Sequence, residues 1–374
     1  MEIDNHLISS LIESAMSADY TGVRRIGGQI AKRLAEQNDL EGAKAIQGML
    51  RKRGVPLQAS GYAEALPRDV ASRLPLVEEG QWPTTPAILG GEASHAISQF
   101  IEDAKHIALL AEKGVSARLG LLLFGPPGTG KTLLAGHIAA ALERPFYIAR
   151  LDSLISSRLG ETAKNIRGIF DFVPTRNAVL FLDEIDAVAK LRDDRHELGE
   201  LKRVVNTVLQ GLDSLSDDVV TIGATNHPHL LDPAIWRRFP YKAELGLPDS
   251  DVRNALWLHF LFEGNEKRNK DAQILAHVSQ GLNGADIENL ALAVRRRSIL
   301  GKEEPSLAQI ILAIRASHSG SPRLLDNREI TTADKKVVAS LLHETGNVSQ
   351  SDIARIVGVS RQMVHRYLNE ETDG

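Results

Sequence analysis

One eight-residue segment constrains this chain more than any other. The phosphate-loop pattern G-x-x-x-x-G-K-[ST] is matched in full by Gly125-Pro126-Pro127-Gly128-Thr129-Gly130-Lys131-Thr132. This segment follows an apolar run and precedes a stretch with helical character. The pattern predicts a strand, a loop whose backbone N–H groups surround phosphate oxygens, and a helix whose positive end faces them. Lys131 would then contact the β- and γ-phosphates, and the Thr132 hydroxyl would bind Mg²⁺.

A second apolar segment, residues 179–182, ends in the carboxylates Asp183 and Glu184. At the end of a strand beside the phosphate loop, Asp183 would bind Mg²⁺, directly or through water. Glu184 would polarise the attacking water as a general base. The alternative is a helix N-terminus that favours acids, which is the reading we give Asp186. The separation of about fifty residues from the loop, with another strand between, favours the catalytic reading of the pair.

Strand-like segments alternate with helical ones through the middle of the chain. We expect strands at 121–124, 146–149, 179–182, 219–224 and 243–245, and a helix from Ile97 to about Lys113. This alternation predicts an α/β fold with a parallel sheet covered on both faces. Ile26, Ile30 and Leu34 recur every four residues, so residues 1–53 are expected to be helical, and proline and glycine mark residues 54–90 as a linker.

Composition excludes several classes of protein. The 374 residues include no cysteine, which rules out disulfides, cysteine-bound zinc, iron–sulfur clusters and thiol nucleophiles. No apolar run approaches the ~18 residues that span a bilayer, so we expect a cytoplasmic protein that does not bind membranes. The formal net charge of −4 argues against a nucleic-acid coat, but not against a small DNA-binding module.

Taken together, the motifs of residues 121–300 resemble the AAA family within the AAA+ superfamily of ring-forming ATPases. Ala224-Thr225-Asn226 closes the next strand, and the resemblance implies that Asn226 positions the water and senses the γ-phosphate. The segment 231–239 is similar to the family's second homology region. Its Arg237 and Arg238 would act as fingers on a neighbouring subunit's nucleotide, a role that suits the guanidinium fork. The alternative is a surface arginine pair.

The segment 281–287 is similar to the G-x-S-G-A-D-I stretch of AAA lids, which implies that Gly284 and Ala285 approach the nucleotide base. The resemblance implies ATP and Mg²⁺ as cofactors and a homo-oligomeric ring, typically a hexamer. It also implies a P-loop AAA+ parallel-sheet core with an α-helical lid. We expect a helical module and linker at 1–80, the large ATPase subdomain at 81–247, the lid at 248–318, and a helix-turn-helix at 325–374.

Alignment to the pore loop of AAA remodellers, which pull polypeptides with an aromatic residue, places Arg158 at the aromatic position and Leu159 beside it. An arginine there favours acidic segments or phosphates over apolar grip. The alternative is a loop that never touches substrate.

Residues 332–370 read as three short helices that resemble the helix-turn-helix of Fis-like and resolvase-like DNA-binding domains. Small Ala354 lies four residues before the turn residue Gly358, which lets two helices cross closely. Candidate DNA contacts at the start of the last helix are Ser360, Arg361, Gln362 and His365. The alternative is a helical bundle that docks a protein.

These observations predict a Mg²⁺–ATP-hydrolysing ring that remodels or unfolds a protein partner and is tethered to DNA by its C-terminal module. One alternative is an ATP-gated, DNA-recruited assembly switch that regulates a partner without threading it. Another is a nucleotide-gated scaffold with negligible turnover, against which Glu184 argues. Comparable bacterial AAA proteins are sometimes paired with a protease, which makes a protease a candidate partner.

Overall fold

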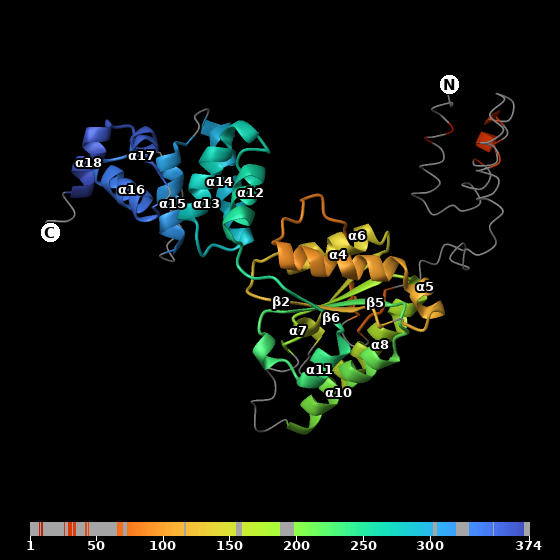
Figure 1. The fold of residues 1–374 in the computed structure, drawn as a ribbon. Helices are drawn as coiled ribbons and strands as arrows, with labels where there is room; N and C mark the ends of the chain where they lie inside the picture. Colours follow the sequence, from red (N-terminus) through yellow and green to blue (C-terminus); the bar gives the residue numbers. More distant parts are fainter. Residues whose placement is uncertain are drawn as a thin grey trace. The chain divides into compact units, whose positions relative to one another are not determined.

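The computed structural model describes residues 66–69, 73–115, 117–154, 159–187, 198–301, 305–318, 329–346 and 348–369. It also describes residues 7, 9, 26, 29–31, 33, 34, 42 and 44. The chain divides into two compact units, Met1–Leu66 and Pro67–Gly374, and each is treated by itself below (Figure 1).

In the first unit, the described residues include one apolar cluster. Ile26, Ile30 and Leu34 are buried together, and Leu7 packs against them. All four are helical. The spacing of four residues therefore forms one buried helical face, as predicted. The other described residues within 1–53, which are residues 9, 29, 31, 33, 42 and 44, are helical too. The rest of the helical prediction for residues 1–53 lies outside the described residues.

A six-stranded sheet forms the centre of the second unit, in the order β1-β3-β4-β5-β2-β6. Its strands are β1 (Glu78–Gly80), β2 (Gly120–Phe124), β3 (Phe146–Arg150), β4 (Val179–Asp183), β5 (Val220–Thr225) and β6 (Tyr241–Glu244). Strands β2 to β6 pair in parallel, and β1 pairs antiparallel with β3. The central strands β4 and β5 are buried almost throughout, as expected of a sheet covered on both faces.

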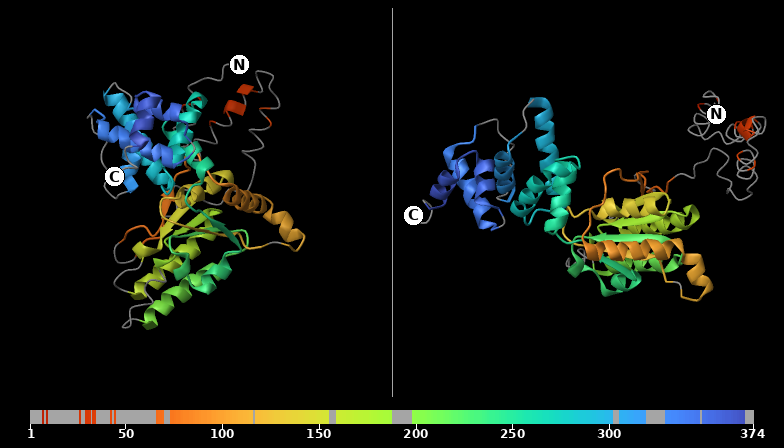
Figure 2. Two further views of the ribbon diagram at one scale, coloured as in Figure 1. Left: turned by 60° about the vertical axis from the view of Figure 1, so that its left-hand side comes forward. Right: turned by 45° about the horizontal axis from the view of Figure 1, so that its top comes forward.

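Helices cover the two faces of this sheet (Figures 1 and 2). On one face lie α4 (Gly91–Lys105) and α6 (Lys131–Ala141), whose apolar residues share a core with the strands. On the other lie α8 (Leu159–Phe172), α10 (Leu198–Ser214) and α11 (Pro233–Arg238). Shorter elements are α5 (Ile107–Glu112), α7 (Leu151–Leu154) and the 3₁₀ turns Val173–Arg176, Pro228–Leu230 and Glu266–Arg268. The sequence and structure thus agree on an α/β core.

The predicted boundaries differ from the structure in two places. The helix expected from Ile97 to Lys113 begins earlier, at Gly91, and is interrupted at His106, whose N–H is shared between the carbonyls of Glu102 and Asp103. Strand β1 was not predicted, because it is only three residues long and reads Glu-Glu-Gly. The five predicted strands are confirmed, with ends shifted by one or two residues.

After β6 the unit continues with described elements that are all helical. It contains α12 (Ser250–Phe260), α13 (Asn269–Val278), α14 (Gly284–Gly301), α15 (Leu307–His318), α16 (Thr332–Glu344), α17 (Gln350–Val357) and α18 (Arg361–Asn369). The three short helices predicted within 332–370 are therefore present. None of the described helices is long and apolar enough to cross a membrane.

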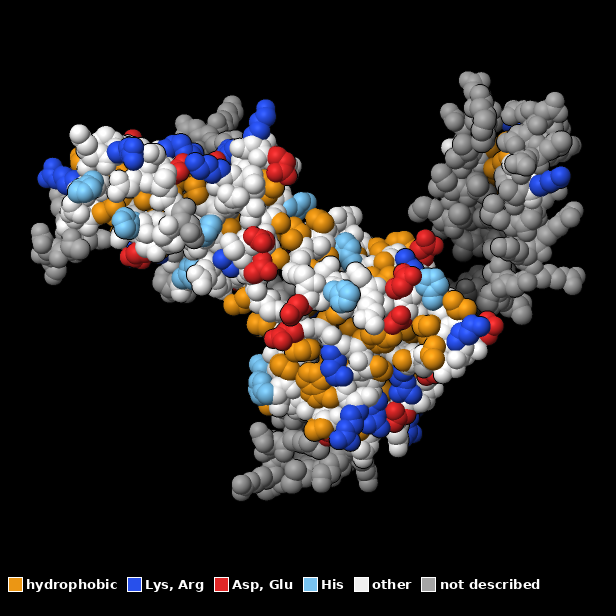
Figure 3. Space-filling model, viewed as in Figure 1, with side chains coloured by type: hydrophobic (Ala, Val, Ile, Leu, Met, Phe, Trp, Pro, Cys, Tyr) orange, Lys and Arg blue, Asp and Glu red, His pale blue; other side chains and the backbone are white. Residues whose placement is uncertain are grey.

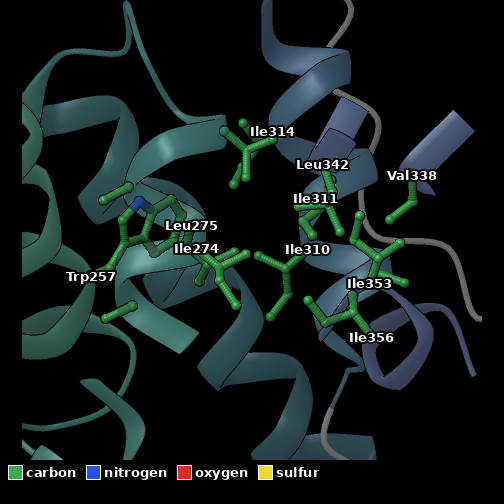
Figure 4. Close-up of a cluster of buried hydrophobic side chains, with 14 of the residues drawn as sticks. Trp257, Ile274, Leu275, Ile310, Ile311, Ile314, Val338, Leu342, Ile353 and Ile356 are labelled. Carbon is green, nitrogen blue, oxygen red and sulfur yellow. The ribbon is translucent and has the colours of Figure 1, made fainter. Parts of the chain in front are cut away.

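One continuous hydrophobic core joins the four helices α12–α15 to the three C-terminal helices. Figure 4 shows Trp257 and Leu275 at one side of it, Ile310 and Ile311 in the middle, and Ile353 at the other side. Ion pairs reinforce this packing, because Arg355 of α17 lies 2.9 Å from Asp271 of α13. A second pair joins Lys270 to Asp352 at 2.8 Å. The C-terminal helices therefore pack directly onto the preceding helices.

Candidate functional site

A cavity of about 710 Å³ lies at the carboxyl ends of the parallel strands and is closed on one side by α12 and α14. This is the edge at which open α/β sheets bind ligands. It brings together most residues that the sequence assigned to nucleotide chemistry. Those that line it are Pro127, Gly128, Thr129, Gly130, Lys131, Thr132, Asp183, Glu184, Asn226, Gly284 and Ala285.

Two glycines of the phosphate loop are required by their surroundings. Gly125 has φ +144°, and a Cβ there would lie 2.1 Å from the backbone oxygen of Leu245. Gly128 has φ +75°, and its Cβ would lie 2.6 Å from the side chain of Asn283. The carbonyl of Gly128 also accepts a hydrogen bond from the N–H of Ala285 at 3.1 Å. The start of α14 therefore contacts the phosphate loop directly, and only glycine allows this approach.

Lys131 is buried at the first turn of α6, with 8% of its surface exposed. Its Nζ donates hydrogen bonds to the carbonyls of Gly125 at 2.9 Å and Pro126 at 2.7 Å. Burial lowers the pKa of Lys131, and the carboxylates of Asp183 and Asp186 oppose this shift. A phosphate beside Nζ would further favour the charged ammonium.

Thr132 and Asp183 meet at the place where the sequence predicts Mg²⁺. Thr132 Oγ1 lies 3.5 Å from Asp183 Oδ2, longer than a normal O–H···O hydrogen bond, so both oxygens retain capacity for a cation. Burial raises the pKa of Asp183, while the N–H of Glu184 donates to its other oxygen at 2.9 Å and lowers it. A cation would favour the ionised carboxylate. One hydroxyl and one carboxylate fit Mg²⁺, which binds few protein oxygens and completes its shell with water and phosphate.

No larger cluster of metal ligands occurs in the described part of the chain, where no three His, Cys, Asp or Glu side chains gather as a metal site. His227 and His229 form an edge-to-face ring pair, with centroids 5.7 Å apart. Their contact is an aromatic one.

Glu184 and Asn226 occupy adjacent strand ends beside this metal position. Glu184 follows β4 with φ +53°, a left-handed conformation that is uncommon outside glycine, and its side chain is exposed to the cavity. Asn226 follows β5, and its Oδ1 is buried without a hydrogen-bond donor among the described residues. Both side chains thus present acceptors that can bind the hydrogens of a water molecule.

The two arginines of α11 differ in their surroundings. Arg238 donates through Nε at 3.1 Å and through a terminal nitrogen at 2.8 Å to the two carboxylate oxygens of Asp213, and it also bonds the carbonyl of Ala234. This contact raises the pKa of Arg238 and lowers that of Asp213. Arg237 is exposed, and none of the described residues forms an ion pair with it. Neither arginine lines the cavity of its own chain.

One wall of the cavity was not identified from the sequence. It is formed by residues 85–91, which the sequence placed at the end of the linker and the start of the ATPase subdomain without assigning them to the cavity. The helix of the phosphate loop holds this segment, because His137 Nε2 lies 2.7 Å from the carbonyl of Thr85. Pro83 packs so closely on Gly136 that a Cβ there would lie 2.8 Å from its ring. The signal that could have found this wall is the apolar run 87–89 between Pro86 and Gly90.

The proposed DNA contacts lie on one exposed face of α18. Ser360 caps the helix by accepting a hydrogen bond from the N–H of Met363 at 3.3 Å. Arg361, Gln362 and His365 are exposed, whereas Val364 and Tyr367 are buried. Figure 3 shows basic and histidine side chains spread over this C-terminal region.

The two predicted pore-loop residues are the remaining candidates. Arg158 lies outside the described residues, and Leu159 begins α8 without a described side chain.

Comparison with known proteins agrees with this geometry. Residues 121–247 match the AAA family, described as the ATPase family associated with various cellular activities. An uncharacterised AAA family ATPase of Sinorhizobium fredii is 34% identical over 220 residues, which are 56% of this chain and 66% of that protein.

Two further relatives have named activities. An ATP-dependent zinc metalloprotease FtsH of a Sulfurovum species is 31% identical over 275 residues, 70% of this chain and 40% of that protein. A proteasome-activating nucleotidase of Methanopyrus kandleri is 32% identical over 242 residues, 62% of this chain and 56% of that protein. The chain thus spans between about two fifths and two thirds of the length of these relatives.

Proposed function

We propose that this chain, which carries an AAA family ATPase domain, hydrolyses Mg²⁺–ATP as a ring-forming motor that remodels a protein partner. The observation that carries the proposal is the convergence of Lys131, Asp183, Glu184 and Asn226 on one cavity at the strand ends. Position and charge there match what phosphoryl transfer requires, since catalysis of this reaction depends on positioning and electrostatic stabilisation.

Each residue has a defined part in this reaction. The N–H groups of the phosphate loop and Lys131 bind the β- and γ-phosphates, and Gly284 and Ala285 close the cavity from α14. Thr132 and Asp183 would hold Mg²⁺, which offsets the phosphate charge. Asn226 accepts one hydrogen of the attacking water and orients it. Glu184 accepts the other hydrogen bond and takes the proton as the oxygen attacks.

A second copy of the chain completes the site in this proposal. Arg237 and Arg238 were both predicted as fingers, and Arg237 is the one whose guanidinium is exposed. A guanidinium donated across an interface would stabilise the charge that develops on the transferred phosphoryl group. Head-to-tail contacts of this kind build a closed ring or an open filament, and we expect a ring of six copies.

Mixing two inactive variants tests this arrangement. E184Q lacks the base but keeps its arginines, and R237A lacks the finger but keeps its base. Mixed assemblies should recover ATP turnover at interfaces that join an intact base to an intact finger. The arrangement in trans is wrong if the mixture stays as inactive as the two parents while both assemble.

A protein partner is proposed because two relatives are named for coupling ATP to proteolysis or to the proteasome. The given sequence contains no H-E-x-x-H motif, so it carries no zinc-protease site of that type. The test is to trap partners on E184Q in ATP and to compare R158A and R158Y. If both substitutions leave partner remodelling unchanged, the alternative is favoured, in which ATP controls assembly without threading.

The C-terminal helices are proposed to form a helix-turn-helix that tethers the assembly to DNA. The supporting observation is the shared exposed face of Arg361, Gln362 and His365 on α18, next to the left-handed turn at Gly358. Replacing all three with alanine should abolish DNA retention at low salt and spare ATP turnover. DNA retention that survives this triple change would support a protein-docking role for these helices.

A further inference from the structure

Thr225 lies where three parts of the nucleotide site meet. It is the last residue of β5 and directly precedes Asn226. Its carbonyl accepts a hydrogen bond from the N–H of Gly125, the first residue of the phosphate loop, at 3.3 Å. Its hydroxyl donates to Asp186 Oδ1 at 2.8 Å and accepts from the N–H of His227 at 2.9 Å. A single side chain thus connects the ends of two neighbouring strands.

The Thr225–Asp186 contact is shielded from water. Each residue has 1% of its surface exposed, so the hydrogen bond forms in a low-dielectric setting where it is strong and directional. Asp186 lies two residues after Glu184, in a turn that a second bond ties to β5, from the Ile185 N–H to the Ala224 carbonyl at 3.0 Å. The turn that carries Glu184 is therefore fastened to the strand that carries Asn226.

The backbone of Glu184 needs contacts of this kind to hold its conformation. A left-handed φ of +53° costs a residue with a side chain free energy, and it persists only where neighbouring contacts hold it. Its backbone conformation decides where its carboxylate lies relative to the buried Oδ1 of Asn226. Because both groups would bind one water, their separation has to be held to a fraction of an ångström.

We infer that Thr225 and Asp186 are positioning residues, which fix Glu184 and Asn226 relative to each other so that both bind the same water. This inference rests on the proposed ATP hydrolysis. Neither residue would touch the reacting atoms. Loss of the Thr225 hydroxyl should therefore slow turnover of bound ATP and leave ATP binding intact.

The same strand supplies a matched control. Thr221, also on β5, is buried with 3% of its surface exposed, and among the described residues its hydroxyl has no hydrogen-bond partner. T221V and T225V make the same change of shape in the same strand. Only T225V removes a hydroxyl that connects the two parts of the site, so general effects on the core appear in both variants.

The experiment measures kcat and KM for ATP, together with equilibrium binding of a fluorescent ATP analogue, in the full-length chain. We expect T225V to lower kcat on the order of tenfold or more, with KM and the binding constant changed less than about twofold. T225S, which keeps the hydroxyl, should recover most of the lost kcat. T221V should resemble the wild type.

The result that overturns the inference is a T225V enzyme with wild-type kcat, or one that loses ATP binding in parallel with kcat. Equal losses in T221V and T225V would also overturn it, because they would assign the effect to packing of β5. These outcomes are distinct from failure of the proposed function, which would show as a wild-type chain that does not hydrolyse ATP. That result would overturn the proposed function and this inference together.

Discussion

Replacement by alanine is expected to have different effects at the two arginines of α11: R238A should lower the stability of the fold, and R237A should lower ATP turnover. R238A removes two hydrogen bonds to the carboxylate of Asp213 and one to the Ala234 carbonyl. The side chains of Arg238 and Asp213 are 26% and 49% exposed. An ion pair this exposed stabilises by at most about 1 kcal/mol. The loss does not strand a charge, because Arg118 remains 3.4 Å from Asp213. We therefore expect R238A to cost about 1 kcal/mol of folding free energy.

For a unit as large as Pro67–Gly374, about 1 kcal/mol corresponds to a fall of about 1–2 °C in the midpoint of thermal unfolding. R237A breaks no ion pair among the described residues, so its midpoint should match the wild type. Its ATP turnover should fall instead, by the factor of about 10³ or more that an arginine finger contributes. Differential scanning calorimetry and phosphate release, measured on the same samples, separate the two effects.

The stability that Arg238 contributes should depend on pH. The hydrogen bond from Arg238 lowers the pKa of Asp213 below its ordinary value of 3.8. The stabilisation is therefore complete above about pH 4 and is lost as pH falls through the lowered pKa. The stability gap between wild type and R238A should hold from pH 8 to pH 5 and close in stronger acid. An R238A chain of unchanged stability with an R237A chain of full activity would refute the reasoning.

Two further predictions concern the cavity walls. G128A should weaken ATP binding at least tenfold, because the added methyl group would lie 2.6 Å from Asn283 at φ +75°. The control is G264A, which has a similar φ of +74° but lies outside the cavity and whose Cβ would meet nothing within 4 Å, so it should bind ATP nearly normally in the same titration. H137A should raise KM for ATP several-fold at unchanged kcat, because it removes the hydrogen bond to the Thr85 carbonyl. H137Q can still donate a hydrogen bond and should restore KM. An unchanged KM in H137A would show that the 85–91 wall does not depend on this hydrogen bond.

The phosphate loop and the acidic pair could be predicted because their chemistry is local. A strand, eight loop residues and a helix contain all that the phosphate site needs, and Glu184 follows Asp183 directly. The buried strands β2 and β4 were equally accessible, since they read as apolar runs. Strand β6 reads Tyr-Lys-Ala-Glu, and its predicted start was two residues late.

What could not be predicted depends on contacts between distant segments. The wall at residues 85–91 lies between proline and glycine residues that are typical of a linker. Its contact with His137, and the neighbouring contact of Pro83 with Gly136, hold it at the cavity. Asp186 was assigned to a helix start, because its partner Thr225 lies 39 residues away along the chain. The different surroundings of Arg237 and Arg238 depend on Asp213, which no sequence pattern connects to them.

The packing of the C-terminal helices onto the preceding ones could not be predicted either, because it also depends on contacts between distant segments. The spacing of apolar residues predicted three helices, but it could not show that Ile353 and Ile356 share a core with Ile310 and Ile311. Nor could it show that Arg355 forms an ion pair with Asp271, which lies 84 residues away along the chain.

The central claim is that Glu184 activates water for attack on ATP bound at Lys131. It is tested most directly by phosphate release and nucleotide binding in wild type and E184Q, at saturating ATP and Mg²⁺. The account predicts that the wild type hydrolyses ATP and that E184Q binds it with similar affinity but turns over about 10²- to 10⁴-fold more slowly. Phosphate release by E184Q at the wild-type rate would contradict it.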